Sequence, residues 1–209
     1  MFQTADWYFH EDLARQDGYQ FVCGIDEAGR GPLAGPVFAA AVILPEHAQI
    51  EGLNDSKKLT PKKREALYDV IVKTAVAWGV GFATESEIDE VNILQATFLA
   101  MQRAFNKLQI TPDCALVDGN RMPTLGVETR LIVKGDSLSA SIAAASILAK
   151  VSRDRVMCQI DDIYPEYGFA KHKGYGTKFH VEMLRKIGPC PVHRKTFLKK
   201  ILPEYGHAL

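Results

Sequence analysis

The strongest constraint on this chain is a pair of adjacent carboxylates, Asp26 and Glu27, which follow an apolar run and directly precede a glycine-rich turn. The apolar run spans residues 21–25, and a second one, 37–44, comes soon after the turn. Charged side chains are unfavourable in an apolar sheet unless they are paired, hydrogen-bonded or bound to a metal. The pair is therefore either a surface feature of a turn or half of a divalent-metal site.

Two further short strands favour the metal site, because each is followed by an acidic residue. One apolar run ends at Asp118, and another ends shortly before Asp136. In α/β sheets, ligands bind in the crevice outside the C-terminal ends of the strands. We therefore expect these two residues to converge there with Asp26 and Glu27, and to offer divalent cations the hard oxygen ligands that they prefer.

The glycines of the turn do not indicate a nucleotide-binding loop. Gly29, Gly31 and Ala34 match the spacing of the dinucleotide fingerprint, but that fingerprint opens a helix, whereas Pro36 leads into a second strand. Two glycines on either side of Arg30 allow bare backbone to approach a ligand closely, and they would equally allow a tight turn with positive φ.

The patterning predicts an α/β fold with a five-stranded mixed sheet flanked by helices. Strands are expected at residues 21–26, 36–45, about 76–84, 114–118 and 130–133. The first two are joined by a tight turn and should be antiparallel, while helical segments between the later ones suit parallel crossovers.

Helices are expected at residues 61–74, 85–92, 94–108, 137–163 and 177–187, followed by a short helical tail. Thr60 is the predicted N-cap of the first of these helices, and Pro61 its first residue. The helix from residue 137 should follow Asp136 immediately, which would place this carboxylate at the positive end of the helix.

The length of 209 residues fits a single domain, with a catalytic core at about 20–165 and a basic helical extension at about 166–209. The net charge is zero, but residues 170–209 hold nine lysines and arginines against two glutamates. Lys57 and Lys58 begin a second basic cluster. Each cluster is either a solvated face or a contact for phosphate groups.

The chain should be cytoplasmic. No apolar stretch approaches the ~20 residues that cross a bilayer, and residues 1–20 lack the pattern of a secretory signal. The four cysteines occur singly, which is typical of reduced, structural thiols. Residues 203–209 contain no clear partner-binding motif.

Several motifs, in order, resemble the type 2 ribonuclease H family, and within it bacterial ribonuclease HII. They are the segments 24–37, 54–59, 118–119, 134–136, 141–151 and 172–177. The resemblance implies a ribonuclease H-like fold and hydrolysis of RNA paired with DNA, including single ribonucleotides embedded in duplex DNA. Because four carboxylates in one place repel one another, we further expect two divalent ions, Mn²⁺ or Mg²⁺, and we expect a monomer.

Carried over by position, the four acidic residues of the family fall on Asp26, Glu27, Asp118 and Asp136. The glycine-arginine-glycine segment by which the family recognises the ribose falls on Gly29, Arg30 and Gly31, and its substrate tyrosine falls on Tyr175. Apart from this carry-over, we expect Lys57 and Lys58 to hold backbone phosphates. One departure is visible at residues 194–197, which match only partly the arginine-rich end expected for the family.

Two questions stay open at this stage. Neighbours on a strand point to opposite faces, so either the strand has bent at Glu27 or the backbone carbonyl of Glu27 does part of the coordination. The alternatives in function are another metal-dependent nuclease of the same fold, such as a junction resolvase or an exonuclease, and a nucleic-acid-binding module without catalysis.

Overall fold

The computed structural model describes residues 7–203, and its sheet has five strands in the order β3-β2-β1-β4-β5. The strands are β1 (Val22–Ala28), β2 (Val37–Ile43), β3 (Ala77–Ala83), β4 (Cys114–Asp118) and β5 (Glu128–Ile132). The β1–β2 and β2–β3 pairs are antiparallel, and the β1–β4 and β4–β5 pairs are parallel. The predicted mixed sheet is confirmed. Residues 204–209, most of the tail in which no partner motif was found, lie outside the described residues.

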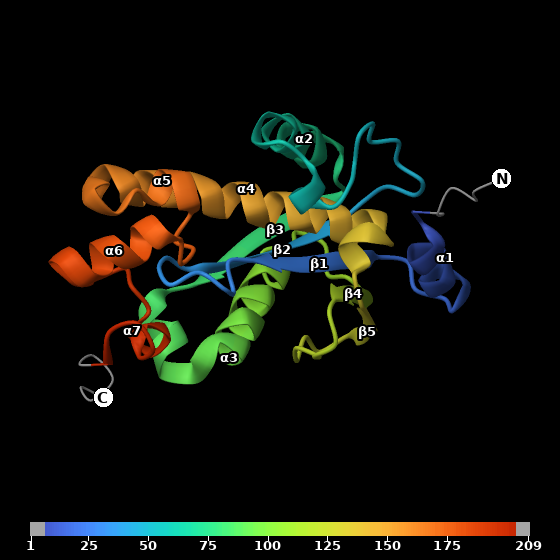
Figure 1. Cartoon of the computed structure of the whole chain (residues 1–209). Coiled ribbons are helices and arrows are strands. Elements are labelled where there is room, and N and C mark those ends of the chain that lie inside the picture. Colours follow the sequence, from blue (N-terminus) through green and yellow to red (C-terminus); the bar gives the residue numbers. More distant parts are fainter. Residues whose placement is uncertain (1–6, 204–209) are drawn as a thin grey trace.

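Helices cover both faces of the sheet. They are α1 (Phe9–Gln16), α2 (Pro61–Thr74), α3 (Glu85–Phe105), α4 (Ala140–Ile163), α5 (Phe169–His172), α6 (Lys178–Ile187) and α7 (Lys195–Leu198), with 3₁₀ turns at Ser56–Lys58, Gly135–Ser137 and Pro165–Tyr167. Figure 1 shows α4 and α2 on one face, α3 on the other, and α5, α6 and α7 gathered at one end. These last three form the helical extension that the sequence predicted.

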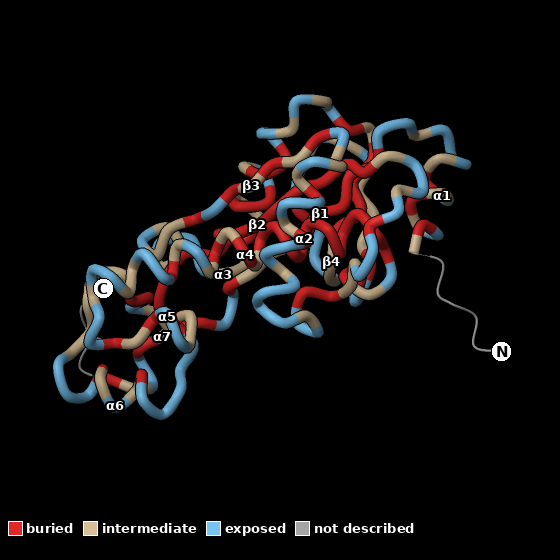
Figure 2. The backbone as a smooth tube through the Cα atoms, turned by 90° about the horizontal axis from the view of Figure 1, so that it is seen from above, coloured by how far each residue is buried: buried red, intermediate tan, exposed pale blue. Residues whose placement is uncertain are grey.

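Small residues let the helices lie unusually close to the sheet. A Cβ atom on Gly24 of β1 would lie 2.2 Å from the carbonyl carbon of Ser141 in α4, and one on Gly81 of β3 would lie 2.4 Å from the carbonyl oxygen of Ala100 in α3. Buried residues are concentrated in the central strands and in α4 (Figure 2). The strand ends that carry the acidic residues are therefore supported from both faces.

The two helices predicted at 85–92 and 94–108 are confirmed as the two halves of α3, which are separated by a sharp break at Asn92, although the second half ends at Phe105. The φ of Asn92 is 66°, and its side-chain oxygen accepts hydrogen bonds from the amides of Leu94 and Gln95 at 3.0 and 3.2 Å. Asn92 thus caps the second half of the helix, as an N-cap residue does.

The predicted start of α4 was wrong. Asp136 lies in the 3₁₀ turn Gly135–Ser137, and the helix begins only at Ala140. Ser139 is the N-cap, and its hydroxyl accepts the amide of Ile142 at 3.2 Å. Asp136 is consequently not at the first turn of the helix, and the helix end does not account for its charge.

The sequence did not predict α1, which supplies a buried acceptor to the start of α4. Glu11 is 2% exposed, and its Oε1 accepts hydrogen bonds from the Ser139 hydroxyl at 2.6 Å and from the hydroxyl and amide of Ser141 at 2.6 and 2.9 Å. The carboxylate thus satisfies groups at the helix start that would otherwise be buried without partners.

Replacing Glu11 by Ala should lower the free energy of unfolding by about 2–3 kcal/mol, because three buried donors lose their acceptor. Urea denaturation followed by circular dichroism measures this change. Glu46→Ala is the control, since the Glu46 side chain is 73% exposed and should contribute less than about 0.5 kcal/mol. Equal stabilities of the two variants would contradict the assignment.

Candidate active site

The parallel register of the two central strands brings two acidic residues to one edge of the sheet. β1 and β4 pair Ile25 with Val117, and the next residues along the two strands are Asp26 and Asp118. Asp26 is only 4% exposed, and its Oδ1 accepts the amide of Glu27 at 2.7 Å. Two carboxylates that are far apart in the sequence are therefore neighbours in space.

Asp136 joins this pair through the turn that follows β5. The amide of Gly135 donates a hydrogen bond to Oδ1 of Asp118 at 2.7 Å, and the next residue, Asp136, is 5% exposed. The position of Asp118 thus fixes the turn that carries Asp136.

The pKa values show that these carboxylates repel one another. Burial raises the pKa of Asp26 well above its usual range, and the charges of Glu27, Asp118 and Asp136 raise it further. Burial also raises the pKa of Asp118, and the charge of Asp136 adds to this, while the Gly135 amide opposes it. The structure therefore brings the four predicted acidic residues close enough to interact at one edge of the sheet, as a cluster with an excess of negative charge.

Glu27 lies within regular strand pairing. It is paired with Ala39, and β1 continues to Ala28, so the ladder does not end at Glu27. Its Oε1 is 3.5 Å from Nη1 of Arg30. Burial raises the pKa of Glu27, the Arg30 guanidinium lowers it, and the charge of Asp118 raises it. Glu27 is thus close enough to interact with Asp118 while it is partly neutralised by Arg30.

Lys57 lies beside the acidic cluster. Its ammonium nitrogen is 3.1 Å from Oδ2 of Asp136, although the Lys57 side chain is 75% exposed. Lys57 belongs to the 3₁₀ turn Ser56–Lys58, and Asp55 stabilises the start of this turn by accepting the amide of Lys57 at 2.9 Å. Lys58, the next residue, is exposed to solvent.

The two segments predicted to read the ribose are in contact. A Cβ atom on Gly31 would lie 3.7 Å from Cε1 of Tyr175, so the tyrosine ring packs against the bare backbone of the glycine turn. The amide of Leu33 donates to the carbonyl of Gly174 at 2.8 Å and ties the two loops together. Tyr175 remains 46% exposed and is available to a ligand.

Two buried histidines that the sequence did not single out support the Tyr175 loop. His180 Nδ1 is 2.9 Å from the Tyr175 carbonyl, which only accepts, so this nitrogen carries the proton. His180 Nε2 then accepts from Nε2 of His193 at 2.9 Å, and Nδ1 of His193 accepts the amide of Cys190 at 3.0 Å. In this assignment both rings are neutral, and Nδ1 of His193 also lies 3.1 Å from the Cys190 carbonyl.

Acid should therefore destabilise the protein between pH 6.5 and 4. Burial lowers the pKa of both His180 and His193 to about 4, whereas an unfolded histidine titrates near 6.5. The stability is complete above pH ~6.5 and is lost as the pH falls toward ~4, because only the unfolded chain takes up the protons in that range. Melting temperatures measured between pH 7.5 and 4 record the loss.

A variant separates this effect from general acid denaturation. His193→Gln should flatten the pH dependence, because it removes one of the two buried rings. An undiminished slope in His193→Gln would show that the pair is not its source.

The donor set suits hard divalent cations, although the side chains are not closed around a site. Four carboxylates supply only oxygen ligands, and their mutual repulsion favours bound positive charge. Within residues 7–203, no three His, Cys, Asp or Glu side chains converge as a ready-made metal-binding group. The ammonium of Lys57 provides the positive charge beside Asp136 in this arrangement.

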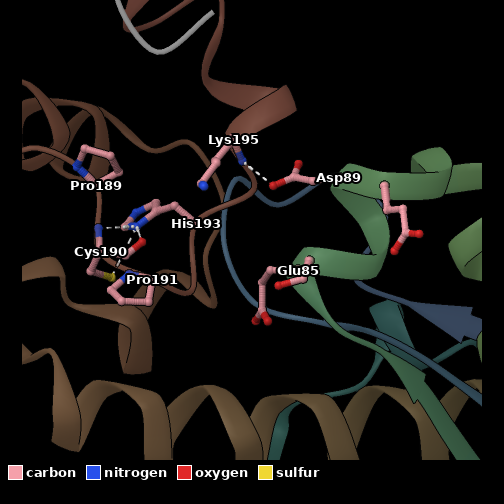
Figure 3. A pocket seen from close by; sticks show the side chains of 9 residues that line it. Glu85, Asp89, Pro189, Cys190, Pro191, His193 and Lys195 are labelled. Carbon is pink, nitrogen blue, oxygen red and sulfur yellow. Dashed lines mark hydrogen bonds between the residues drawn. The ribbon is translucent and has the colours of Figure 1, made fainter. Parts of the chain in front are cut away.

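A separate cavity of about 750 Å³ lies between the start of α3 and residues 189–195. Figure 3 shows Glu85 and Asp89 on one side of it and His193 and Lys195 on the other. Asp89 accepts the amide of Lys195 at 2.8 Å, which ties α3 to α7. None of the four carboxylates of the acidic cluster lines this cavity, so it is not part of the candidate active site.

Comparison with known proteins points to one family. The family model described as Ribonuclease HII matches residues 23–200. Ribonuclease HII from Caldicellulosiruptor bescii is 58% identical over 200 residues, which cover 96% of this chain and 97% of the relative.

Solved structures agree with the sequence comparison. The ribonuclease H2 from Pyrococcus horikoshii OT3 matches with a TM-score of 0.73 and 29% identity, over 90% of this chain and all of that one. Bst-RNase HIII, solved in complex with Mn²⁺, matches with a TM-score of 0.69 and 20% identity, over 92% of this chain and 72% of that one. The predicted ribonuclease H-like fold is thereby confirmed.

Proposed function

Because this chain belongs to the ribonuclease HII family, and is thus a ribonuclease H enzyme, we propose that it also nicks duplex DNA on the 5′ side of an embedded ribonucleotide. The observation that carries the proposal is the contact between Gly31 and Tyr175, in a turn whose Arg30 lies beside Glu27 of the acidic cluster. A segment that binds a single ribose, next to a site that cleaves one phosphodiester bond, suits a substrate with a single ribonucleotide.

Members of this family are divalent-metal nucleases, and we propose that Asp26, Glu27, Asp118 and Asp136 hold two ions, Mg²⁺ or Mn²⁺. When bound, such a pair supplies a water nucleophile at neutral pH and stabilises the leaving 3′ oxygen, giving 5′-phosphate and 3′-hydroxyl ends. Two findings support the assignment: the four charges repel one another in the free protein, and Bst-RNase HIII binds Mn²⁺.

The residues of the chain have distinct parts in this proposal. Asp26 and Asp118 stand at the centre of the sheet edge, where the two central strands fix their positions. The Gly135 amide holds Asp118, and Lys57 holds Asp136 until cations and substrate arrive. Lys57 and Lys58 then contact backbone phosphates, so substrate binding should weaken steeply with salt.

Only the 2′-hydroxyl distinguishes a ribose from a deoxyribose, and it both donates and accepts hydrogen bonds. We propose that the backbone of Gly29, Arg30 and Gly31 binds this hydroxyl while the ring of Tyr175 packs on the neighbouring sugar. The glycines leave the backbone accessible, and the exposed tyrosine faces the same surface.

Cleavage mapping tests the proposal. Three duplexes of one sequence, with one, four or no ribonucleotides in one strand, are incubated with protein and Mg²⁺ or Mn²⁺, and the products are sized. Nicking should occur on the 5′ side of the single ribonucleotide, and the all-DNA duplex should remain intact. Cutting of all-DNA duplexes or junctions would favour another nuclease of this fold, and binding without cutting would favour a non-catalytic module.

We also propose that residues 20–165 and 166–209 act as one domain, and that the protein is a monomer that binds RNA–DNA hybrids.

We further propose a cytoplasmic location. Cys23, Cys114, Cys158 and Cys190 are all free thiols, which suits a reducing compartment. Among residues 7–203, every helix is too short or too polar to span a bilayer. Light scattering after size-exclusion chromatography should give a mass near 23.2 kDa.

A further inference from the structure

Two arginines are buried completely behind the glycine turn. Arg153 of α4 is 1% exposed, and Arg194, which precedes α7, is 0% exposed. Burial lowers the pKa of both, that of Arg194 to about 9. A guanidinium is unfavourable inside a protein unless its donors are satisfied, so these positions require an explanation. Because Arg194 is fully buried, it does not reach a phosphate group of a substrate.

Both arginines donate only to backbone carbonyls in the described part of the chain. Arg194 reaches the carbonyls of Gly29 at 2.6 Å, Arg30 at 2.9 Å and Gly35 at 2.7 and 2.9 Å. Its rigid fork of donors thereby holds both ends of the glycine turn.

Arg153 binds the same turn from the side of α4. It donates to the carbonyls of Ala34 at 3.2 Å and Pro36 at 3.0 Å, and also to that of Lys173 at 3.0 Å. Lys173 begins the loop that carries Tyr175. Arg153 therefore fixes the distance between this loop and the glycine turn, the two segments proposed to bind the ribose.

The direction of the carbonyls determines the direction of two amides. The described chain has no cis peptide bonds, and in a trans peptide the N–H points opposite to the C=O. Because the carbonyls of Gly29 and Arg30 point inward to Arg194, the amides of Arg30 and Gly31 point away from it. Within residues 7–203, neither of these amides donates a backbone hydrogen bond.

We propose that Arg194 is a positioning residue for ribose selectivity: by binding two carbonyls of the turn, it turns the Arg30 and Gly31 amides outward as paired donors to the 2′ oxygen. A cation bound to a carbonyl also polarises the peptide, and this strengthens the opposite N–H as a donor. Discrimination between RNA and DNA then depends on a side chain that does not touch the substrate. The inference rests on the proposed reading of the ribose by this turn.

The test measures binding rather than cleavage. In the Asp118→Asn background, dissociation constants are compared for two duplexes that differ only in one ribonucleotide, with and without Arg194→Lys. Lysine keeps the charge but does not hold both carbonyls in a planar fork. We expect the preference for the ribonucleotide duplex to fall about tenfold, the equivalent of one hydrogen bond, while affinity for the all-DNA duplex stays within about twofold.

Arg103→Lys is the matched control, because Arg103 also donates to a carbonyl, that of Phe82, but lies on α3 beside the edge strand β3. It should leave the preference unchanged. An unchanged preference in Arg194→Lys, or an equal loss of affinity for both duplexes, would overturn the proposal. Failure of the proposed function would be seen separately, as absence of nicking by the wild-type protein at the ribonucleotide.

A second measurement needs no variant and remains decisive if Arg194→Lys does not fold. Amide hydrogen exchange of Arg30 and Gly31 should be fast in the free wild-type protein. It should become slow with the ribonucleotide duplex, under metal-free conditions that prevent cleavage, and should remain fast with the all-DNA duplex. Slow exchange in the free protein, or equal protection by both duplexes, would overturn the proposal.

Discussion

Asp118→Asn should lower the rate of hybrid cleavage at least about a thousandfold, which corresponds to a loss of about 4 kcal/mol of transition-state stabilisation. Asp118 lies at the C-terminal end of a central strand beside Asp26, so the variant removes a charge from the middle of the proposed cation site. The amide oxygen of Asn can still accept the Gly135 N–H, and the fold should therefore persist. Single-turnover cleavage and hybrid binding, measured separately, check this outcome.

The same variant should be more stable than the wild-type protein in metal-free buffer. Burial and neighbouring charges raise the pKa of Asp118, so its ionised form destabilises the fold at neutral pH, and a neutral isostere relieves the repulsion. Adding Mg²⁺ or Mn²⁺ should raise the melting temperature of the wild-type protein more than that of the variant.

Asp113→Asn is the control for the cleavage measurement. Asp113 lies just before the opposite end of β4 and accepts the amides of Gln20 and Phe21, away from the acidic cluster. It should cleave at the wild-type rate. Wild-type cleavage by Asp118→Asn in the presence of metal would show that the assignment of this carboxylate is wrong.

Features that depend on neighbouring residues could be predicted from the sequence. Thr60 and Pro61 marked the start of α2, where the Thr60 hydroxyl does accept the amide of Lys63. The strand patterns located all five strands to within two residues at each end, and most clearly β1, β2 and β4, whose burial on both faces leaves a continuous apolar signature. The acidic residues in the last positions of β1 and β4 were visible as charges at the ends of such runs.

Features that depend on distant partners could not be predicted. In the sequence, Glu11 is only one acidic residue in a polar segment, because its partner Ser139, at the start of α4, lies 128 residues later. Arg194 belongs to a basic stretch in the sequence, and only its contacts with the glycine turn, more than 150 residues away, distinguish it from the exposed lysines around it. His180 and His193 were likewise indistinguishable from surface residues, because their partners are backbone groups and each other.

Replacing Gly29 in the glycine turn should cause a large loss of stability, because Gly29 combines a positive φ with a close contact. Its φ is +97°, and an added Cβ would lie 2.0 Å from Nε of Arg153. That nitrogen is held by the carbonyl of Pro36, so the side chain has no free direction in which to move. Gly29→Ala should therefore lower the free energy of unfolding by about 3–5 kcal/mol, from backbone strain and overpacking together.

Gly18→Ala separates the two contributions. Gly18 has a φ of +100°, but an added Cβ would meet no atom within 4 Å, so this variant should lose only the backbone term, about 1–2 kcal/mol. Urea denaturation of both variants gives the difference, which measures the contact between the turn and Arg153. If both variants lost the same free energy of unfolding, the Arg153 side chain would be free to move aside. The turn would then not be rigid enough to hold its amides in a fixed orientation toward a ribose.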